Sequence, residues 1–274
     1  IPFYLKAVKK GLSAIQNINE ICFSEHALLL NEFNNLFSSL FKHSERHEAI
    51  VKLLATKRQG VNRADIEAKT QCKGGALTRV LNELKCAGFI QRFTPWGKKR
   101  SYYFKLVDEY SLFYLNWISP PDKTVHVKSL SEHFWDGASQ SQAWRAWAGL
   151  AFESVCFKHL DSIKKSFNIP ESAYAYSWQY VAPKKSGLAG AQIDLLFERD
   201  DGIVNICEIK YSDSPFKIDQ AYAQNLKHKI NTYKAVSKTT KQVVLSMITT
   251  AGLADSVYTQ GLVWSDISLA DLFT

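Results

Sequence analysis

Three charged residues that could support metal chemistry lie on two consecutive apolar stretches in the second half of the chain. Asp194 lies in the first stretch, and the second contains Glu208 and Lys210 with one residue between them. Residues two apart on a strand point to the same face, so the Glu208 and Lys210 side chains project together. Buried carboxylates are costly unless they are paired or hold a metal. Two acids and a lysine therefore predict a Mg²⁺ (or Mn²⁺) site with a general base beside it.

The segment between the two stretches, residues 199–202, predicts a tight hairpin turn. A four-residue turn places Asp194 opposite Cys207, which leaves Asp194 and Glu208 on opposite faces of the sheet. An odd-length connection or a β-bulge instead brings Asp194 opposite Glu208. Metal chemistry requires one of these two arrangements. The structural alternative for the charged residues is a salt-bridge cluster without a ligand.

Two predicted helices could add polar groups to this site. Glu153 interrupts the apolar positions of a helix expected over 144–165, and it is either a further metal ligand or a solvated helix residue. Lys229 and Tyr233 lie one turn apart on a helix expected over 219–236. They either position a phosphate group or cap the edge of the sheet.

Positive charge is concentrated in the first part of the chain. Residues 1–118 contain 18 Lys and Arg against 10 Asp and Glu, whereas residues 119–274 contain 16 of each. The excess predicts that the first part binds a polyanion, and the alternative is a basic surface that maintains solubility. The chain has no apolar run long enough to span a membrane, and its five cysteines form no CxxC pattern. These features predict a cytoplasmic protein without a membrane partner.

Residues 45–107 predict a small DNA-binding domain. The expected elements are helices at 48–55, 62–69 and 74–86, followed by strands at 89–93 and 102–106. Asn62 is a good N-cap for the second helix, and Gly88 is a C-terminal stop for the third. Three helices and a hairpin with a basic tip are typical of a winged helix-turn-helix, which places its third helix in the major groove of DNA.

The predicted DNA contacts fall into two groups. Thr78, Arg79, Asn82 and Lys85 are expected along the exposed face of the third helix, and the phosphate contacts expected at the hairpin tip are Lys98, Lys99 and Arg100. The helical face contains little Arg, which predicts weak sequence specificity. The same domain type also serves as a protein–protein module, and this alternative remains open.

Ser119, Pro120 and Pro121 interrupt the chain after an aromatic helical segment. We therefore expect a domain boundary there, with a helical and winged-helix domain over 1–118 and an α/β domain over 119–274. The predicted fold class is α/β in the broad sense that includes α+β.

The arrangement of Asp194, Glu208 and Lys210 resembles the PD-(D/E)XK nuclease superfamily, whose core is an Asp on one strand and (Asp/Glu)-x-Lys on the next. The opening "PD" is degenerate here, because Gln192 and Ile193 precede the aspartate. The resemblance implies a restriction-endonuclease-like domain over 119–274.

The same resemblance implies a division of roles. Asp194, Glu208, Glu153 and the Ile209 backbone carbonyl would hold the metal, and Lys210 would orient or deprotonate the attacking water. The reaction would be hydrolysis of DNA to products that carry 5′-phosphates. Many nucleases of this superfamily carry Q-x-x-x-Y on the helix that corresponds to 219–236. Here Lys229 replaces the Gln of that motif and Tyr233 supplies its Tyr.

The order of motifs along nearly the whole chain is similar to the C-terminal half of archaeal-type AAA+ ATPases. The segments that carry this similarity are residues 1–5, 34–41, 93–103, 108–114, 151–153 and 194–210. In that family a P-loop ATPase domain precedes a winged helix and a PD-(D/E)XK-like domain. This chain contains no GxxxxGK[ST] loop.

The resemblance therefore implies that this chain is part of a longer protein. The first residues of the chain would be a remnant of a helical lid, and an AAA+ ATPase domain would be a further partner. The competing interpretation is a non-catalytic DNA- or protein-binding module that regulates such an ATPase.

Overall fold

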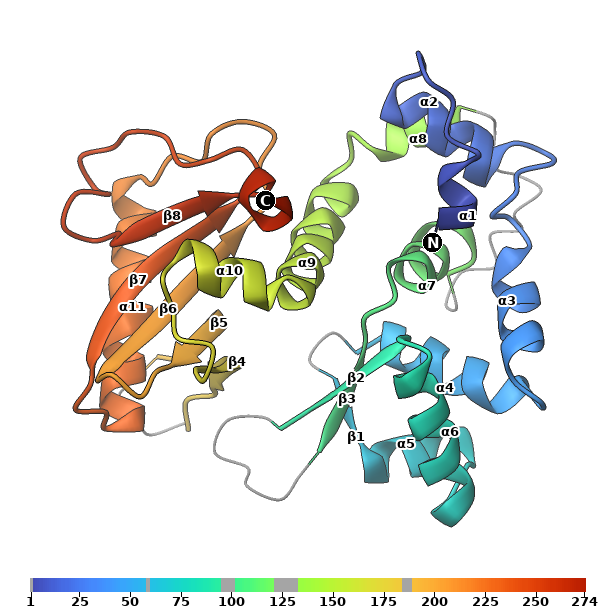
Figure 1. The fold of residues 1–274 in the computed structure, drawn as a ribbon, viewed down its shortest axis with the longest axis horizontal. Coiled ribbons are helices and arrows are strands. Elements are labelled where there is room, and N and C mark those ends of the chain that lie inside the picture. Colours follow the sequence, from blue (N-terminus) through green and yellow to red (C-terminus); the bar gives the residue numbers. More distant parts are fainter. Residues whose placement is uncertain (1, 58–59, 95–101, 121–132, 184–188) are drawn as a thin grey trace. The chain divides into compact units, whose positions relative to one another are not determined.

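The computed structural model describes residues 2–57, 60–94, 102–120, 133–183 and 189–274 (Figure 1). The described residues up to Arg145 form one compact unit, and those from Ala146 onward form a second. None of the helices in the described ranges has the length and apolar character needed to cross a membrane.

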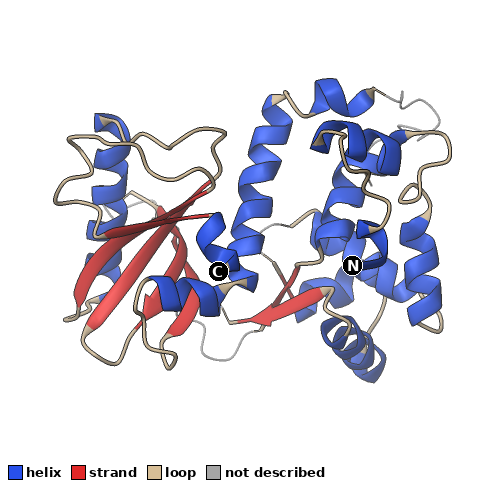
Figure 2. Cartoon of the chain, turned by 45° about the horizontal axis from the view of Figure 1, so that its top comes forward, coloured by secondary structure: helices blue, strands red, loops and turns tan. Residues whose placement is uncertain are grey.

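The first unit is mostly helical and contains a small antiparallel sheet (Figure 2). Its helices are α1 (Pro2–Leu5), α2 (Ala14–Ile18), α3 (Glu32–Leu40), α4 (Glu45–Ala55), α5 (Arg63–Thr70), α6 (Gly74–Cys86), α7 (Glu109–Phe113) and α8 (Phe134–Ala138), with π-helical turns at Asn19–Phe23 and Tyr114–Ile118. The strands β1 (Val61–Asn62), β2 (Ile90–Phe93) and β3 (Tyr103–Leu106) pair in the order β1-β3-β2.

The predicted boundary at residue 119 differs from the division between the two units. Residues 133–145 belong to the first unit, where Trp135 is buried and stacks on Phe23 with ring centroids 5.7 Å apart. The Trp135 backbone N–H also donates to the Asn19 side chain (2.9 Å). Burial of this large ring carries residues 133–145 into the first unit.

The helix boundaries predicted at Asn62 and Gly88 in the first unit agree with the structure. The N-cap predicted at Asn62 is confirmed, since its side chain accepts a hydrogen bond from the Asp65 backbone N–H (2.9 Å). Gly88 has a φ of 79° and follows α6, as expected of a helix stop. Before α3, the Ala27 N–H donates to the Ser24 carbonyl and forms a turn, and the helix begins at Glu32.

The second unit is a five-stranded sheet with helices on both faces. Its strands are β4 (Tyr174–Tyr180), β5 (Ala191–Glu198), β6 (Ile203–Lys210), β7 (Gln242–Thr249) and β8 (Ser265–Ser268), and its helices are α9 (Gln142–Lys158, from Ala146 onward), α10 (Leu160–Ser166), α11 (Gln220–Ser237) and a 3₁₀ turn at Ala270–Phe273. The strands pair in the order β4-β5-β6-β7-β8, antiparallel through β6 and parallel from β6 to β8.

Helices lie on both faces of this sheet (Figure 1), and two layers of apolar side chains hold them there. One layer joins α9 and α10 to β5, β6 and β7 through Phe152, Cys156, Ile163, Leu195, Phe197, Cys207, Ile209 and Ile248. The other layer joins α11 to the opposite face through Ala223, Leu226, Leu196, Val204, Ile206 and Met247. The single helix expected over 144–165 is divided at His159, whose φ and ψ of −111° and 31° leave the helical range. The sheet is therefore the scaffold on which Asp194, Glu208 and Lys210 are placed.

Candidate functional site

The register of the β5–β6 hairpin determines where Asp194 lies relative to Glu208. Glu198 pairs with Val204 and Leu195 pairs with Cys207, so residues 199–203 make an odd-length connection. The paired residues end at Leu195 and Cys207, and beyond them the Ile209 N–H donates to the Asp194 carboxylate, which brings Asp194 beside the Glu208–Lys210 end of β6. This outcome confirms one of the two arrangements that the hairpin sequence allowed.

A β-bulge also lies at Asp194. On the other side of β5, Tyr176 pairs with Leu196 and Trp178 pairs with Ile193, so β5 has one residue more than β4 over this interval. Bulges bend a strand and redirect the side chains at the extra residue. Asp194 is inside this interval, which accounts for a polar side chain at a position bounded by apolar residues on both sides.

The Asp194 carboxylate is buried, with 8% of the residue exposed, and its two oxygens differ. Oδ2 accepts a hydrogen bond from the Ile209 backbone N–H (3.1 Å), whereas Oδ1 has no hydrogen bond to any described residue. Burial is the main cause that raises the pKa of Asp194 to about 6, and the negative charge of Glu208 adds to it. Lys229, the Ile209 N–H and Lys210 lower this pKa without cancelling the rise. A bound cation would relieve both costs.

Glu208 is 1% exposed, and its carboxylate is surrounded by cationic and polar partners. Oε1 accepts from the Tyr222 hydroxyl (2.7 Å) and lies 3.4 Å from Lys210 Nζ. Oε2 accepts from Lys229 Nζ at 2.6 Å. Lys210 Nζ also lies 5.3 Å from the centroid of the Tyr222 ring, within cation–π range. The carboxylate is therefore neutralised by side chains from both its own strand and α11.

The third predicted acid does not complete a metal cage in this arrangement. Glu153 lies half-buried on α9, and its charge, together with that of Asp194, adds to the burial that raises the pKa of the Cys156 thiol. Over the described ranges of the chain, no group of three or more His, Cys, Asp or Glu side chains is placed to hold a metal ion. The metal role of Glu153 stays a prediction.

The predicted pair on α11 is separated by the fold. Lys229 reaches Glu208, but Tyr233 is 2% exposed and packs edge-on against Trp178 with ring centroids 5.4 Å apart. Tyr233 therefore belongs to the apolar layer between α11 and the sheet, and its predicted phosphate role has no support from this placement.

Tyr222 is a site residue that the sequence pattern did not single out. It lies in the first turn of α11, where Asp219 caps the helix by accepting a hydrogen bond from the Tyr222 N–H (2.7 Å). Tyr222 and Lys229 are separated by two helical turns, so both face the sheet at Glu208. The only sequence signal for Tyr222 was its spacing from Lys229, because its ring is apolar and its hydroxyl is polar.

The exposed face of α6 carries the predicted nucleic-acid contacts. Arg79, Asn82 and Lys85 are all exposed there. Arg79 Nε donates to Glu83 (2.8 Å), and Glu83 also hydrogen bonds to the buried His47 (2.8 Å). The positive charge of Arg79 is thus partly balanced within the helix. The other predicted contacts, Lys98, Lys99 and Arg100, lie outside the described residues.

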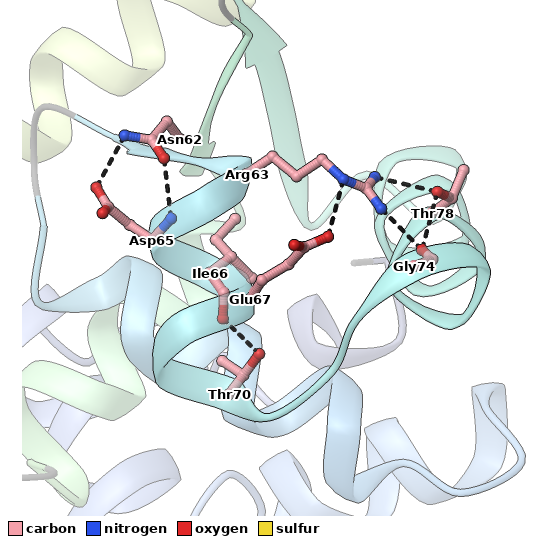
Figure 3. A network of polar contacts seen from close by, with 8 residues as sticks. All are labelled: Asn62, Arg63, Asp65, Ile66, Glu67, Thr70, Gly74 and Thr78. Carbon is pink, nitrogen blue, oxygen red and sulfur yellow. Dashed lines mark hydrogen bonds and ion pairs between the residues drawn. The ribbon is translucent and has the colours of Figure 1, made fainter.

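Arg63 links α5 to the first turn of α6 (Figure 3). Its guanidinium donates to Glu67 on its own helix (3.1 Å), to the Thr78 hydroxyl (3.0 Å) and to the Gly74 carbonyl (2.7 Å). The planar, multi-donor guanidinium suits this geometry better than a lysine would. The Thr78 hydroxyl, a predicted contact, is already engaged by Arg63, and the network fixes α6 relative to α5.

Comparisons of the chain with protein-family models, with curated proteins and with solved structures find no match. The functional interpretation therefore depends on the chemistry of Asp194, Glu208 and Lys210 and on the surface of α6.

Proposed function

We propose that this chain is a metal-dependent DNA endonuclease whose site comprises Asp194, Glu208 and Lys210. The observation that supports the proposal is the proximity of two buried carboxylates on neighbouring strands: the Glu208 charge raises the pKa of Asp194, and Lys210 lies 3.4 Å from Glu208. Ordinary sheets contain isolated Glu–Lys pairs, but a second acid buried beside the first has a cost that a bound cation would offset.

The available donors fit a hard divalent cation. Asp194 Oδ1 is without a hydrogen bond among the described residues, and Ile209 donates its N–H to the other oxygen of the same carboxylate. In an extended strand the N–H and C=O of one residue face the same neighbouring strand, so the Ile209 carbonyl is on the Asp194 side of β6. Asp194, Glu208 and the Ile209 carbonyl would hold Mg²⁺ or Mn²⁺, which prefer oxygen ligands. Glu153 is a further candidate ligand.

The side chains around the metal position have separate tasks in this proposal. When bound, the cation supplies charge stabilisation to the reacting phosphate. Lys210, at the exposed end of the Glu208-x-Lys210 motif, orients the attacking water or accepts its proton. Tyr222 holds both Glu208 and Lys210 in place through its hydroxyl and its ring.

The first unit is proposed to hold the DNA. The helices α4, α5 and α6 followed by the β2–β3 hairpin have the element order of a winged helix-turn-helix, and β1 adds the short third strand common in that domain. Residues 1–118 carry the whole excess of positive charge. Arg79, Asn82 and Lys85 supply exposed polar groups on the helix that would enter the groove.

A second candidate function is a non-catalytic module that binds DNA or a protein partner and regulates an ATPase. The neutralisation of Glu208 by Lys229, Lys210 and Tyr222 favours it, because such a carboxylate is satisfied without a ligand. The burial of Asp194 beside the charge of Glu208, a cost that a bound cation would offset, favours the nuclease.

Cleavage of supercoiled, linear and branched DNA separates the two candidates. Wild-type protein with Mg²⁺ or Mn²⁺ is compared with the variants Asp194→Asn and Lys210→Met, and with Asp255→Asn, which alters an exposed aspartate in the same unit. We expect cutting that EDTA abolishes, that both site variants lose and that the control variant retains. If no protein cuts and all bind DNA equally in EDTA, the binding module is the better description.

A further inference from the structure

We propose that Lys229 is an exchangeable counter-ion: it holds Glu208 until a divalent cation takes that carboxylate, and its freed ammonium group then binds a substrate phosphate. The inference rests on the proposed function, since it concerns the same site. It adds a coupling between metal binding and phosphate binding.

The two oxygens of Glu208 are used differently, and this difference permits the exchange. Oε1 is held by Tyr222 and approached by Lys210, whereas the polar contact of Oε2 among the described residues is with Lys229. A cation that binds Oε2 therefore displaces one partner and leaves the other two in place. Glu208 keeps its orientation during the exchange, because its position depends on Oε1.

Lys229 also lies where a cation would interact with both acids. Its positive charge also lowers the pKa of Asp194, so it acts on both carboxylates. Its Nζ is 2.6 Å from Glu208, and its side chain is 17% exposed, so the charge is largely shielded from solvent. The ammonium group therefore occupies the space beside Oε2 that a divalent cation bound to Glu208 would need.

The net charge of the site explains why cation binding should favour phosphate binding. With both acids ionised, Asp194, Glu208, Lys210 and Lys229 sum to zero, and a divalent cation raises the total to two positive charges. The cation repels the lysine it displaces, and the long flexible stem of lysine lets the ammonium move within the site. A DNA phosphodiester, which has one negative charge, then lowers the total to one positive charge, so metal and phosphate should each tighten the binding of the other.

The first test measures the accessibility of Lys229 in the wild-type protein. A short pulse of acetic anhydride, followed by peptide mass spectrometry, reports the reactivity of each lysine amine. Lys227, exposed on the same helix, is the internal reference. We expect Lys229 to be protected in EDTA and to become several-fold more reactive with saturating Mn²⁺, while Lys227 is unchanged. Continued protection of Lys229 with Mn²⁺ bound would overturn the exchange.

The second test measures Mn²⁺ affinity by calorimetry for wild type, Lys229→Met and the matched control Lys227→Met. Removing a competing cation should tighten Mn²⁺ binding at Glu208 by about fivefold or more, the lower end of typical coupling between two ligands. The control, which removes the same charge from an exposed position on the same helix, should bind like wild type.

The outcomes separate this inference from the proposed function. The exchange is supported if Lys229→Met alone binds Mn²⁺ more tightly than wild type. It is also supported if Lys229→Met binds Mn²⁺ and wild type shows no measurable binding. Equal affinity in all three proteins refutes the exchange and leaves the nuclease proposal intact. No binding by any of them refutes both. If Lys229→Met fails to fold, the acetylation experiment on wild type still decides.

Discussion

Replacing Asp194 with asparagine should stabilise the second unit when no metal is bound. Asparagine has nearly the same shape, and its amide oxygen can still accept the hydrogen bond from Ile209. The substitution removes a carboxylate that is only 8% exposed and faces the charge of Glu208. At most sites, replacing a buried polar group destabilises a protein, so a stabilising effect of Asp194→Asn would be diagnostic.

The magnitude and the pH window follow from the raised pKa of Asp194, which moves from 3.8 to about 6 on folding. Between these values the folded protein binds the proton more tightly than the unfolded chain, so stability is lost as pH rises through 6. Each pKa unit corresponds to about 1.4 kcal/mol, which gives a penalty of about 3 kcal/mol at pH 8 and almost none at pH 4. The asparagine side chain of the variant Asp194→Asn does not ionise, so it carries no such penalty at any pH.

Urea unfolding in EDTA at pH 5, 6.5 and 8 measures this difference. Because the chain has two units, the transition of the second unit is identified at pH 8 by the exposure of Cys207, a fully buried thiol, to a labelling reagent. The advantage of Asp194→Asn should grow with pH, and Asp255→Asn should show no such trend. Equal stability at every pH, or a less stable Asp194→Asn at pH 8, would refute the reasoning.

Three further changes test the supporting contacts. Tyr222→Phe removes the hydroxyl bonded to Glu208 but keeps the ring, so we expect a loss of about 2 kcal/mol in urea unfolding and weaker Mn²⁺ binding by calorimetry; unchanged values would show that the hydroxyl does not position Glu208. Arg63→Met should lower the stability of the first unit by about 1 kcal/mol, because its contacts are partly exposed, and equal loss in the second unit would contradict the assignment. Gly202→Ala should cost about 1 kcal/mol in thermal unfolding, since Gly202 has a φ of 84°, and a neutral result would exclude strain there.

The sequence predicted the position of the β5–β6 hairpin but not its register, because Arg199 could belong either to the turn or to the strand. Arg199 is charged and next to two aspartates, which is typical of a turn, yet its N–H donates to the Ile203 carbonyl (3.2 Å) and extends the ladder. Its guanidinium contacts Asp201 and also donates to Asn205 (3.2 Å), so the charge is satisfied beside the turn. The turn residues proper are 200–202, and Gly202 supplies the positive φ that a three-residue hairpin requires.

The residues on α11 show why the rest of the site was harder to predict. Whether Tyr222 or Tyr233 accompanies Lys229 depends on where α11 crosses the sheet, which is a property of the packed fold. The crossing places Tyr222 over Glu208 and buries Tyr233 against Trp178. Residues four apart in a motif are neighbours along the helix. In the folded protein, the residues that contact Glu208 are those on the part of α11 that crosses its strand.

The unequal treatment of the two carboxylates is the strongest argument that the cluster serves a ligand. Glu208 is almost completely buried yet fully partnered, whereas Asp194 is nearly as buried and has one backbone donor. A cluster retained for stability alone would favour asparagine in place of Asp194, because the amide keeps the Ile209 hydrogen bond and removes a penalty of about 3 kcal/mol at neutral pH. Such uncompensated costs are typical of functional sites. If Mn²⁺ raises the unfolding temperature of wild type but not of Asp194→Asn, the cation supplies the missing partner. If it raises both equally, the buried aspartate needs another explanation.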